Sequence, residues 1–445
     1  MGSGGNTGKQ LPVHKFVRDQ MSVWPLARNN FRALKKVDSR KLTVGGLEVD
    51  VQFNPARSIS TNARTDSGSI AARPCFLCQA NRPAEQMHLC FEGAKRKMYH
   101  VAVNPYPIFP DHIVVASAEH TPQTIWHRFV DMMRLCKRNR DFTFLYNGPH
   151  CGASAPDHFH FQAIPSRSLP LENDVRNCIA LNCSAESGST DVLTYVTSVR
   201  EASLYLYRRF CSGVFVIRGC TSKSVAKLFY RLLDCTATPE GDSEPRFNLF
   251  AWHDGSGYTA VVVLRRCHRS DHYSSTDPAA HLSMSPGCVD MGGVFITVER
   301  GDFEKLTGPV LEDVLSQITV SRSEVDGVVE RLTHVQEMTE ILLRKAPVLE
   351  FEMLSDGAMR REAAFRDGRV EYDGALFDEL YFDAKTSSTR FAGASFVLYG
   401  ESDGPFGKVV DRGYAGALRI VPREGLLWAV NIVGKDDLEH EKFEI

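Results

Sequence analysis

The sequence predicts an α+β protein in which a block of strands and helices occurs twice and a small all-β region follows. Three observations lead to this prediction. Residues 98–164 have the order strand, strand, helix, strand, strand. Residues 213–298 contain the same types of element, which makes an internal duplication plausible. After Pro347, short apolar runs are separated by Asp-Gly and other glycine-rich turns, as in β-hairpins.

The first block spans residues 30–190 and follows a leader, residues 1–29, which we expect to be mostly flexible. Met98–Val103 and His112–Ser117 have the composition of strands. Between them, Asn104-Pro-Tyr-Pro-Ile-Phe-Pro110 contains three prolines, which exclude a regular element.

A helix is predicted over Thr124–Arg138, and two strands follow it. Apolar residues recur there at helical spacing, at Ile125, Phe129, Met132, Met133 and Cys136. Pro122 suits the first turn of such a helix. Phe142–Tyr146 and His158–Ile164 are the two predicted strands, and a glycine-containing loop separates them.

The second block spans residues 191–346. It is predicted to begin with a strand over Gly213–Arg218 and a helix over Ser222–Leu233. A hairpin over Phe247–Leu264, a strand over Gly293–Val298 and two helices within 302–345 follow. Asp254-Gly-Ser-Gly257 supplies the turn of the hairpin. Residues 347–445 are predicted to form the β appendage, which would be a packing element or the edge of a possible homodimer.

Composition and charge exclude several classes of protein. The chain has 445 residues, with 52 lysines and arginines against 54 aspartates and glutamates, so its formal net charge is −2. A near-neutral chain does not produce the positive field of a dedicated nucleic-acid binder. No apolar run approaches the roughly 18 residues of a membrane span, and Met1–Gly8 lacks the apolar core of a secretion signal. We therefore expect a cytoplasmic protein that binds neither nucleic acid nor membranes.

The densest group of reactive residues begins at Asn147 and ends in His158-Phe-His160-Phe-Gln162. Side chains alternate along a strand, so both imidazoles and the amide would project from one face. An imidazole can attack a phosphorus centre and carry the group covalently, and an amide can donate to the phosphoryl oxygens. Backbone N–H groups near Gly152 and Ser154 could hold phosphate oxygens. The alternative is a core strand with two satisfied histidines.

This segment resembles the active-site strand of the histidine triad (HIT) superfamily. It is most similar to the branch with galactose-1-phosphate uridylyltransferase, the GDP-sugar phosphorylases and the diadenosine tetraphosphate phosphorylases. The resemblance covers residues 50–165 well and 200–320 by layout. It implies a duplicated HIT-like antiparallel sheet with helices, in which His160 forms a nucleotidyl–imidazole intermediate and Gln162 binds its phosphate.

The resemblance also implies a reaction and its partners. A nucleotidyltransferase or phosphorylase would act on a nucleotide sugar or a dinucleotide, with phosphate or a sugar phosphate as acceptor. A GDP-sugar is favoured because Phe159-His-Phe-Gln-Ala163 is most similar to the strand of the GDP-sugar phosphorylases. The alternatives are a dinucleoside polyphosphate phosphorylase and a hexose-1-phosphate uridylyltransferase.

Several further residues match parts of the family's nucleotide site. Gly152 and Ser154 match its small-residue loop, and Asn104 matches a segment that lines its nucleotide pocket. The remaining candidates for contacts with phosphate or sugar are Asn147, Arg57 and Arg64. One position departs from the pattern, because Asp157 stands where several of these families have asparagine. A carboxylate there would repel phosphate unless it is paired, and it leaves a non-catalytic, nucleotide-binding regulator as a second hypothesis.

Cys75-x-x-Cys78 is the one cysteine pair whose spacing has a chemical meaning. In the uridylyltransferases a pair of this kind binds zinc, and the matching set here would be Cys75, Cys78, His120 and His158. Two thiolates and two imidazoles form a closed tetrahedral site, which is typical of a structural zinc. The alternatives are a redox pair and two ordinary loop cysteines.

Overall fold

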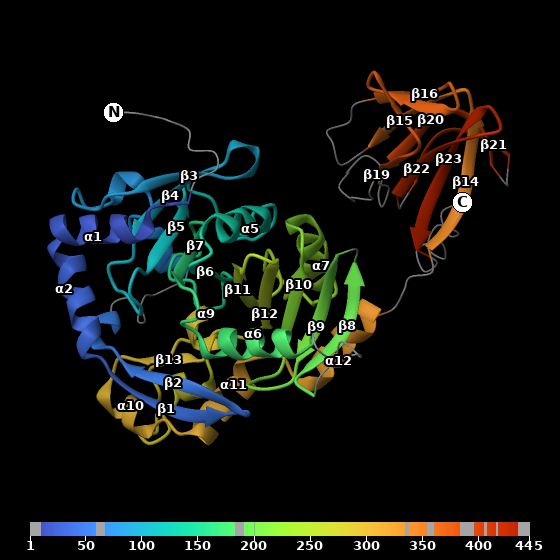
Figure 1. The fold of residues 1–445 in the computed structure, drawn as a ribbon. Helices are drawn as coiled ribbons and strands as arrows, with labels where there is room; N and C mark the ends of the chain where they lie inside the picture. Colours follow the sequence, from blue (N-terminus) through green and yellow to red (C-terminus); the bar gives the residue numbers. More distant parts are fainter. Residues whose placement is uncertain are drawn as a thin grey trace. The chain divides into compact units, whose positions relative to one another are not determined.

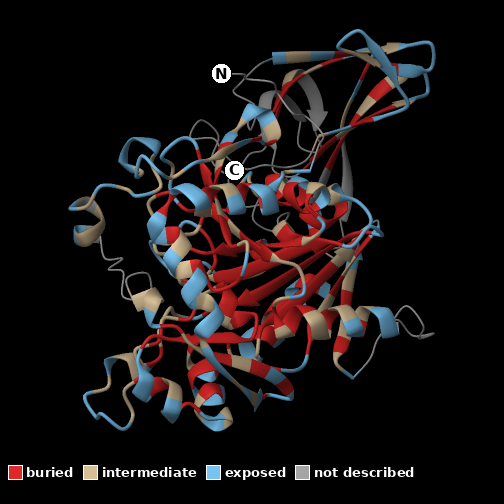
Figure 2. Ribbon diagram, turned by 60° about the vertical axis from the view of Figure 1, so that its left-hand side comes forward, coloured by how far each residue is buried: buried red, intermediate tan, exposed pale blue. Residues whose placement is uncertain are grey.

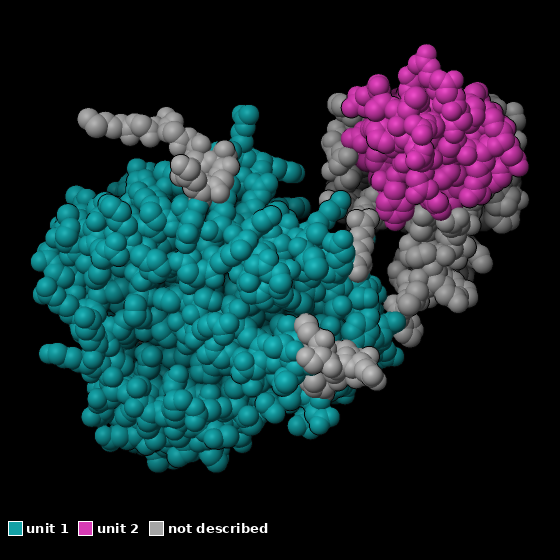
Figure 3. Space-filling model, viewed as in Figure 1, with its two compact units in different colours: residues 1–333 teal, residues 334–445 magenta. Residues whose placement is uncertain are grey.

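The computed structural model describes residues 10–58, 67–182, 191–199, 201–333, 338–353, 360–382, 396–404, 407–414 and 417–434. The chain divides into two compact units, residues 1–333 and residues 334–445 (Figure 3). Two of the predicted segment boundaries differ from this division, because a helix runs through residue 29 and the boundary between the units follows residue 333 instead of residue 346. The predicted boundary after residue 190 stays a prediction. No described helix combines the length and the apolar character needed to cross a membrane.

A ten-stranded antiparallel sheet forms the centre of unit 1 (Figure 1). Its strands lie in the order β3-β4-β5-β7-β6-β11-β12-β10-β9-β8. In chain order they are β3 (Leu89–Glu92), β4 (Met98–Val103), β5 (Ile113–Ser117), β6 (Phe142–Asn147), β7 (His160–Pro165), β8 (Leu193–Val199), β9 (Ala202–Tyr207), β10 (Val214–Gly219), β11 (Phe247–His253) and β12 (Tyr258–Leu264).

The two halves of this sheet have the same topology. The first half has the order β3-β4-β5-β7-β6, and the second half has the order β8-β9-β10-β12-β11. In each half a helix connects the third and fourth strands in chain order. Helix α5 (Phe129–Arg138) connects β5 to β6, and helix α7 (Ser222–Asp234) connects β10 to β11. The halves join where β6 pairs with β11, and the predicted hairpin of β11 and β12 is confirmed. Descent from a duplication stays a prediction.

Layers of other elements cover both faces of the sheet. One hydrophobic cluster contains side chains of α5, α7 and α12, and a second contains side chains of the small sheet β1-β2-β13 and of α11. The buried residues, red in Figure 2, are concentrated in the central strands. The small sheet consists of β1 (Asp38–Val44), β2 (Leu47–Phe53) and β13 (Val294–Thr297). The helices that follow the small sheet's second strand, besides α5 and α7, are α4 (Ser67–Ala71), α6 (Pro170–Asn182), α8 (Asp271–Ser274), α9 (Cys288–Met291), α10 (Arg300–Lys305), α11 (Gly308–Ile318) and α12 (Arg322–Thr333).

Helix α5 begins later than the sequence predicts. Phe129, Met132 and Cys136 are buried on one face, as the helical spacing requires. The chain before Phe129 is not helical because its polar groups have partners elsewhere in the fold. The side chain of Gln123 bonds to the backbone of β6 and β7, and Ile125 donates its N–H to Glu244.

The N-terminal segment is the main correction to the predicted organisation. Residues 10–29 are not a flexible leader, because they form helix α1 (Val13–Val23) and most of helix α2 (Pro25–Ala33). Val13, Phe16 and Val17 are buried against the first hydrophobic cluster. Their spacing of three to four residues is helical, but they are few among polar residues and give a weak signal.

The described elements of unit 2 are all strands, arranged in a four-stranded and a six-stranded sheet around one hydrophobic cluster. They are β14 (Met338–Ala346), β15 (Val348–Met353), β16 (Arg360–Arg366), β17 (Arg369–Tyr372), β18 (Ala375–Phe377), β19 (Leu380–Phe382), β20 (Phe396–Gly404), β21 (Gly407–Tyr414), β22 (Ala417–Arg423) and β23 (Leu426–Gly434).

Candidate active site

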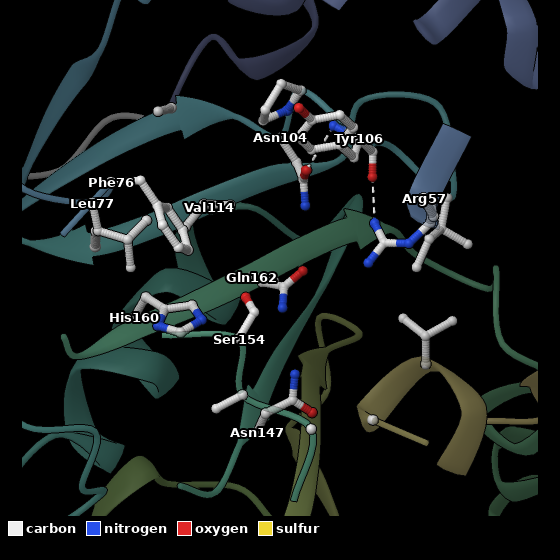
Figure 4. Close-up of a pocket in the computed structure, with 18 of the residues that line it drawn as sticks. Arg57, Phe76, Leu77, Asn104, Tyr106, Val114, Asn147, Ser154, His160 and Gln162 are labelled. Carbon is white, nitrogen blue, oxygen red and sulfur yellow. Dashed lines mark hydrogen bonds between the residues drawn. The ribbon is translucent and has the colours of Figure 1, made fainter. Parts of the chain in front are cut away.

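A pocket of about 450 Å³ opens in unit 1 beside the start of β7. Strands β4, β5, β6 and β7 of the first half of the large sheet line it, together with helix α9 and strand β13. Seven of the eight residues that the sequence predicts for catalysis or substrate binding line this pocket, namely Arg57, Asn104, Asn147, Gly152, Ser154, His160 and Gln162 (Figure 4). The eighth, Arg64, lies outside the described residues.

His160 presents one particular ring nitrogen to the pocket. Its Nδ1 lies 2.9 Å from the backbone oxygen of His158, which can only accept, so Nδ1 carries the proton. The lone pair is therefore on Nε2. Burial lowers the pKa of His160 to about 4, so the ring is neutral at physiological pH. A neutral imidazole with a free lone pair on Nε2 is the form that can act as a nucleophile.

Gln123 fixes the backbone on either side of this imidazole. Its Oε1 accepts the N–H of His160 at 2.8 Å, and its Nε2 donates to the backbone oxygens of His160 and Asn147 at 3.0 and 2.9 Å. All of these groups are buried. One side chain therefore holds β6 and β7 in register at the position of His160.

Gln162 is oriented by a chain of hydrogen bonds that starts at the backbone. The N–H of Ile108 donates to Nδ1 of His112, so the proton of this neutral ring is on Nε2. His112 Nε2 then donates to Gln162 Oε1 at 2.8 Å. The Nε2 amide group of Gln162 is thereby turned toward the pocket, on the same face of β7 as His160 (Figure 4). It is placed to donate to a negatively charged ligand.

The loop before β7 approaches the second half of the chain closely. Gly152 has φ +93°, and a Cβ atom at this position would lie 2.5 Å from Cα of Gly287. Glycine is therefore required here. No described group accepts the N–H of Gly152 or Ser154. These N–H groups are available to phosphate oxygens, as the sequence predicts.

Hydrogen bonds from residues of the second predicted block hold the side chain of Asn147 in place. Its Oδ1 accepts from Asn248 Nδ2 at 2.8 Å and from the N–H of Cys288 at 2.6 Å. Its amide nitrogen consequently points into the pocket, toward Ser154 (Figure 4). Asn248 is in turn held by the buried guanidinium of Arg265 at 2.5 Å.

The charged side chains around the pocket favour an anionic ligand. Four arginines line it, Arg57, Arg73, Arg82 and Arg269, against one described carboxylate, Asp290. Arg57 donates to the backbone oxygen of Tyr106, and Asn104 Oδ1 accepts the N–H of the same residue at 3.0 Å. Burial lowers the pKa of Arg57 to about 10, which still leaves it charged at neutral pH.

The four predicted metal ligands form one compact group next to the pocket. The ligand atoms of Cys75, Cys78, His120 and His158 all lie within 4.8 Å of one another, and the group could hold a metal ion. His158 Nδ1 lies 3.3 and 3.5 Å from the two sulfurs, and His120 Nδ1 lies 3.2 Å from Cys78 Sγ. A tetrahedral zinc with Zn–S of about 2.3 Å and Zn–N of about 2.0 Å requires S···N separations of about 3.5 Å. The donor set and its spacing fit zinc.

His158 connects this group to His160. Its Nε2 donates to the backbone oxygen of Ser117 at 2.8 Å, which leaves Nδ1 as the ligand atom. Its own backbone oxygen accepts from His160 Nδ1. The prediction that both imidazoles and the amide share one face of a strand is wrong for His158. This residue precedes β7 (His160–Pro165), and its ring contacts the cysteines while His160 and Gln162 line the pocket.

Asp157, the position that departs from the family pattern, is paired. Its carboxylate lies 3.7 Å from Arg73 Nη2 and 3.8 Å from His120 Nε2. Arg73 also donates to the backbone oxygen of Ser154 at 2.9 Å. Arg73 therefore offsets the negative charge of Asp157 through an ion pair longer than a hydrogen bond, and the carboxylate lies near the predicted metal ligand His120.

The residues that orient the site were not identified from the sequence. His112, Gln123 and Asn248 contact the reactive groups only because of the fold, at sequence separations of 50, 37 and 101 residues. Arg265 belongs to the basic segment Arg265–Arg269, and a cluster of positive charges in a sequence usually indicates a solvated surface. No local pattern in the sequence marks these four residues.

Glu244 anchors the loop that carries Gln123. Its Oε2 accepts from the N–H of Ile125 at 2.7 Å and from Thr124 Oγ1 at 3.2 Å, and its Oε1 accepts from Tyr146 at 2.6 Å. Burial raises the pKa of Glu244 to about 7, although these donors oppose the shift. The raised pKa means that the folded state favours the protonated acid. This contribution to stability is complete below the ordinary value of 4.5 and is lost as the pH rises through 7.

We expect Glu244→Gln to stabilise the protein at alkaline pH. The Gln amide can keep the acceptor for Ile125 and donate to Tyr146, without a charge to bury. Its free energy of unfolding should exceed that of the wild type by roughly 3 kcal/mol at pH 8 and by less than about 1 kcal/mol at pH 5. Urea unfolding at both pH values measures this, with the exposed Glu240→Gln as control. The same difference at pH 5 and pH 8 would contradict the explanation.

Comparison with known proteins finds one family and several solved structures. Residues 16–165 match a family described as a domain of unknown function, DUF4922. No curated protein matches the chain. The chain is similar to yeast Ap4A phosphorylase Apa2 in complex with Ap4A, with 17% identity, a TM-score of 0.46, and coverage of 70% of this chain and 98% of that one.

Two further solved structures are similar at a lower level. A DUF4931 family protein from Bacillus cereus has 18% identity and a TM-score of 0.29, with coverage of 46% of this chain and 96% of that one. A uridylyltransferase has 10% identity and a TM-score of 0.28, with coverage of 54% and 92%. Similarity at this level does not assign an activity to this chain.

Proposed function

We propose that this chain transfers a nucleotidyl group through a covalent intermediate on His160. The observation that carries the proposal is the hydrogen bond from His160 Nδ1 to the oxygen of His158, which leaves the Nε2 lone pair at a pocket lined by arginines. The ring is neutral and buried, so attack on phosphorus needs no prior deprotonation.

The reaction has two displacements. In the first, Nε2 bonds to the α-phosphorus of the donor, and the bond from that phosphorus to the bridging oxygen breaks. The leaving group departs as a sugar phosphate or a nucleotide and keeps the electron pair of that bond. In the second, an oxygen of inorganic phosphate or of a sugar phosphate attacks the same phosphorus, and the bond to Nε2 breaks. His160 is thereby regenerated.

The neighbouring groups stabilise the charge that develops on the phosphoryl oxygens. Gln162 donates from its oriented amide, and the N–H groups of Gly152 and Ser154 donate from the loop. Asn147 and Arg57 are further donors on the pocket wall. These groups are held in place before the substrate binds, so little reorganisation is needed in the transition state.

We further propose that Cys75, Cys78, His120 and His158 bind a structural zinc ion. Four protein ligands leave no open position, so the ion would hold the Cys75–Cys78 turn against the segment before β7. Because the backbone oxygen of His158 fixes the ring of His160, the metal group also positions the nucleophile.

A GDP-sugar is our proposed donor, on the similarity of Phe159-His-Phe-Gln-Ala163 to the strand of the GDP-sugar phosphorylases. A dinucleoside polyphosphate or a UDP-sugar is the alternative donor, and the same chemistry applies to each. The regulator hypothesis depended on an uncompensated charge at Asp157. The pairing of this carboxylate with Arg73 removes that reason to prefer it.

Intact-protein mass spectrometry tests the proposal. The protein is incubated briefly with GDP-, UDP- and ADP-sugars and with dinucleoside polyphosphates, without an acceptor. We expect a mass increase of one nucleoside monophosphate, and the added mass identifies the base. Binding of a donor without any adduct would contradict the covalent mechanism and favour direct hydrolysis or a regulator.

Gln162→Ala should slow the formation of the adduct by about 10²- to 10³-fold, the usual effect of removing one oriented donor. The apparent affinity for the donor should change much less, because the amide acts mainly on the charge of the transition state. Rapid-quench kinetics of adduct formation measure both quantities. Gln79→Ala, which removes an amide outside the pocket, serves as control. A rate within threefold of the wild type would exclude this role of Gln162.

A further inference from the structure

A second group of metal-binding side chains lies on the edge hairpin of the large sheet. Cys90 belongs to β3, and His88 immediately precedes this strand. His100 on β4 is directly opposite Cys90 in the antiparallel register. Paired residues share a face of the sheet. The imidazole centroids of His88 and His100 are 4.4 Å apart.

The ligand atoms of these three residues lie within 4.8 Å of one another. Metal ligands in a tetrahedral site are separated by about 3.5 Å, so small rotations of the side chains bring them to bonding distance. Nδ1 of His100 is buried and has no hydrogen-bond partner among the described residues. A buried nitrogen without a partner costs free energy unless a ligand satisfies it.

We propose that His88, Cys90 and His100 bind a second divalent cation of the zinc type. Two imidazoles and one thiolate suit Zn²⁺ or Co²⁺ and are poor ligands for Mg²⁺ or Ca²⁺, which require oxygen. Three protein ligands leave one tetrahedral position for water or another oxygen ligand. His100 also lines the pocket that contains His160, so the cation would be held beside this pocket.

This cation is distinct from the one proposed at Cys75 and Cys78. The two groups share no ligand, and the second lacks a fourth protein ligand among the described residues. Cys90 is exposed, and β3 is an edge strand of the sheet, so the second cation should exchange with solvent more readily. The inference does not depend on the proposed nucleotidyl transfer, because it concerns metal binding alone.

Metal analysis of the full-length protein tests the second cation. Protein loaded with excess Zn²⁺ and then dialysed is expected to hold two equivalents. Cys90→Ser and His88→Gln should each hold one, and Cys78→Ser should also hold one. Cys220→Ser removes an exposed cysteine outside both groups and should retain two.

Co²⁺ loading identifies which ligands are used and does not require activity. In Cys90→Ser, the thiolate charge-transfer absorption should come from the group of Cys75 and Cys78 alone. In Cys78→Ser, the absorption should still include the contribution of Cys90. Both histidine and cysteine variants are compared, so misfolding of one does not decide the result. If Cys90→Ser and His88→Gln both take up as much metal as the wild type, the proposal is overturned.

Discussion

Replacing His160 with alanine should abolish the nucleotidyl adduct and lower turnover by at least about 10⁴-fold, because the variant lacks the proposed nucleophile. The reason is geometric. Among the residues that line the pocket, His160 is the histidine on β7 whose Nε2 lone pair faces the oriented amide of Gln162. Steady-state kinetics with the donor identified by mass spectrometry, and the intact mass after incubation, measure the two effects.

The control for this variant is His150→Ala. His150 is an exposed histidine of the loop between β6 and β7 and lies outside the pocket, and its replacement should leave both adduct and turnover unchanged. The His160→Ala protein should still hold its zinc and unfold at a temperature close to that of the wild type. Equal turnover in wild type and His160→Ala would disprove the covalent mechanism. Loss of activity together with loss of zinc would indicate a structural effect instead.

Replacing Cys78 with serine should remove the metal from the first group and destabilise unit 1. A ligand that binds only the folded state and is present at 100 times its dissociation constant stabilises it by about 2.7 kcal/mol. We therefore expect a loss of at least about 3 kcal/mol in the free energy of unfolding, since a closed zinc site with two thiolates binds more tightly than this minimum. Denaturant unfolding and metal analysis of the same preparations measure the two quantities.

Cys220→Ser is again the matched control and should keep both metal and stability. Addition of a strong zinc chelator to the wild type should reproduce the destabilisation of Cys78→Ser, and should have little effect on the variant. If Cys78→Ser loses zinc without any change in stability, the ion has no structural role. If the wild type contains no zinc at this group, the assignment of its four ligands fails, although the role of His160 can stand.

The sequence alone was sufficient for the elements with strong local patterns. The hairpin of β11 and β12 follows from two apolar runs around Asp254-Gly-Ser-Gly257, and the burial of α5 follows from apolar residues at helical spacing. The helices α1 and α2 were missed because a few apolar residues in a polar segment acquire their meaning only from the core that they contact. The extent of α5 was overestimated because Gln123 and Ile125 bond to distant residues.

For the site, the sequence determined which chemical groups are present, and the tertiary structure decided how each one is oriented. His158-Phe-His160-Phe-Gln162 and Cys75-x-x-Cys78 are local patterns, and residue type and spacing are enough to select them. The proton on Nδ1 of His160, the direction of the amide of Gln162 and the pairing of Asp157 are set by hydrogen bonds and charges. His112 lies 50 residues from Gln162, and Arg73 lies on a different loop from Asp157. Such partners meet only when the chain folds, because a hydrogen bond depends on distance in space and not on distance along the sequence.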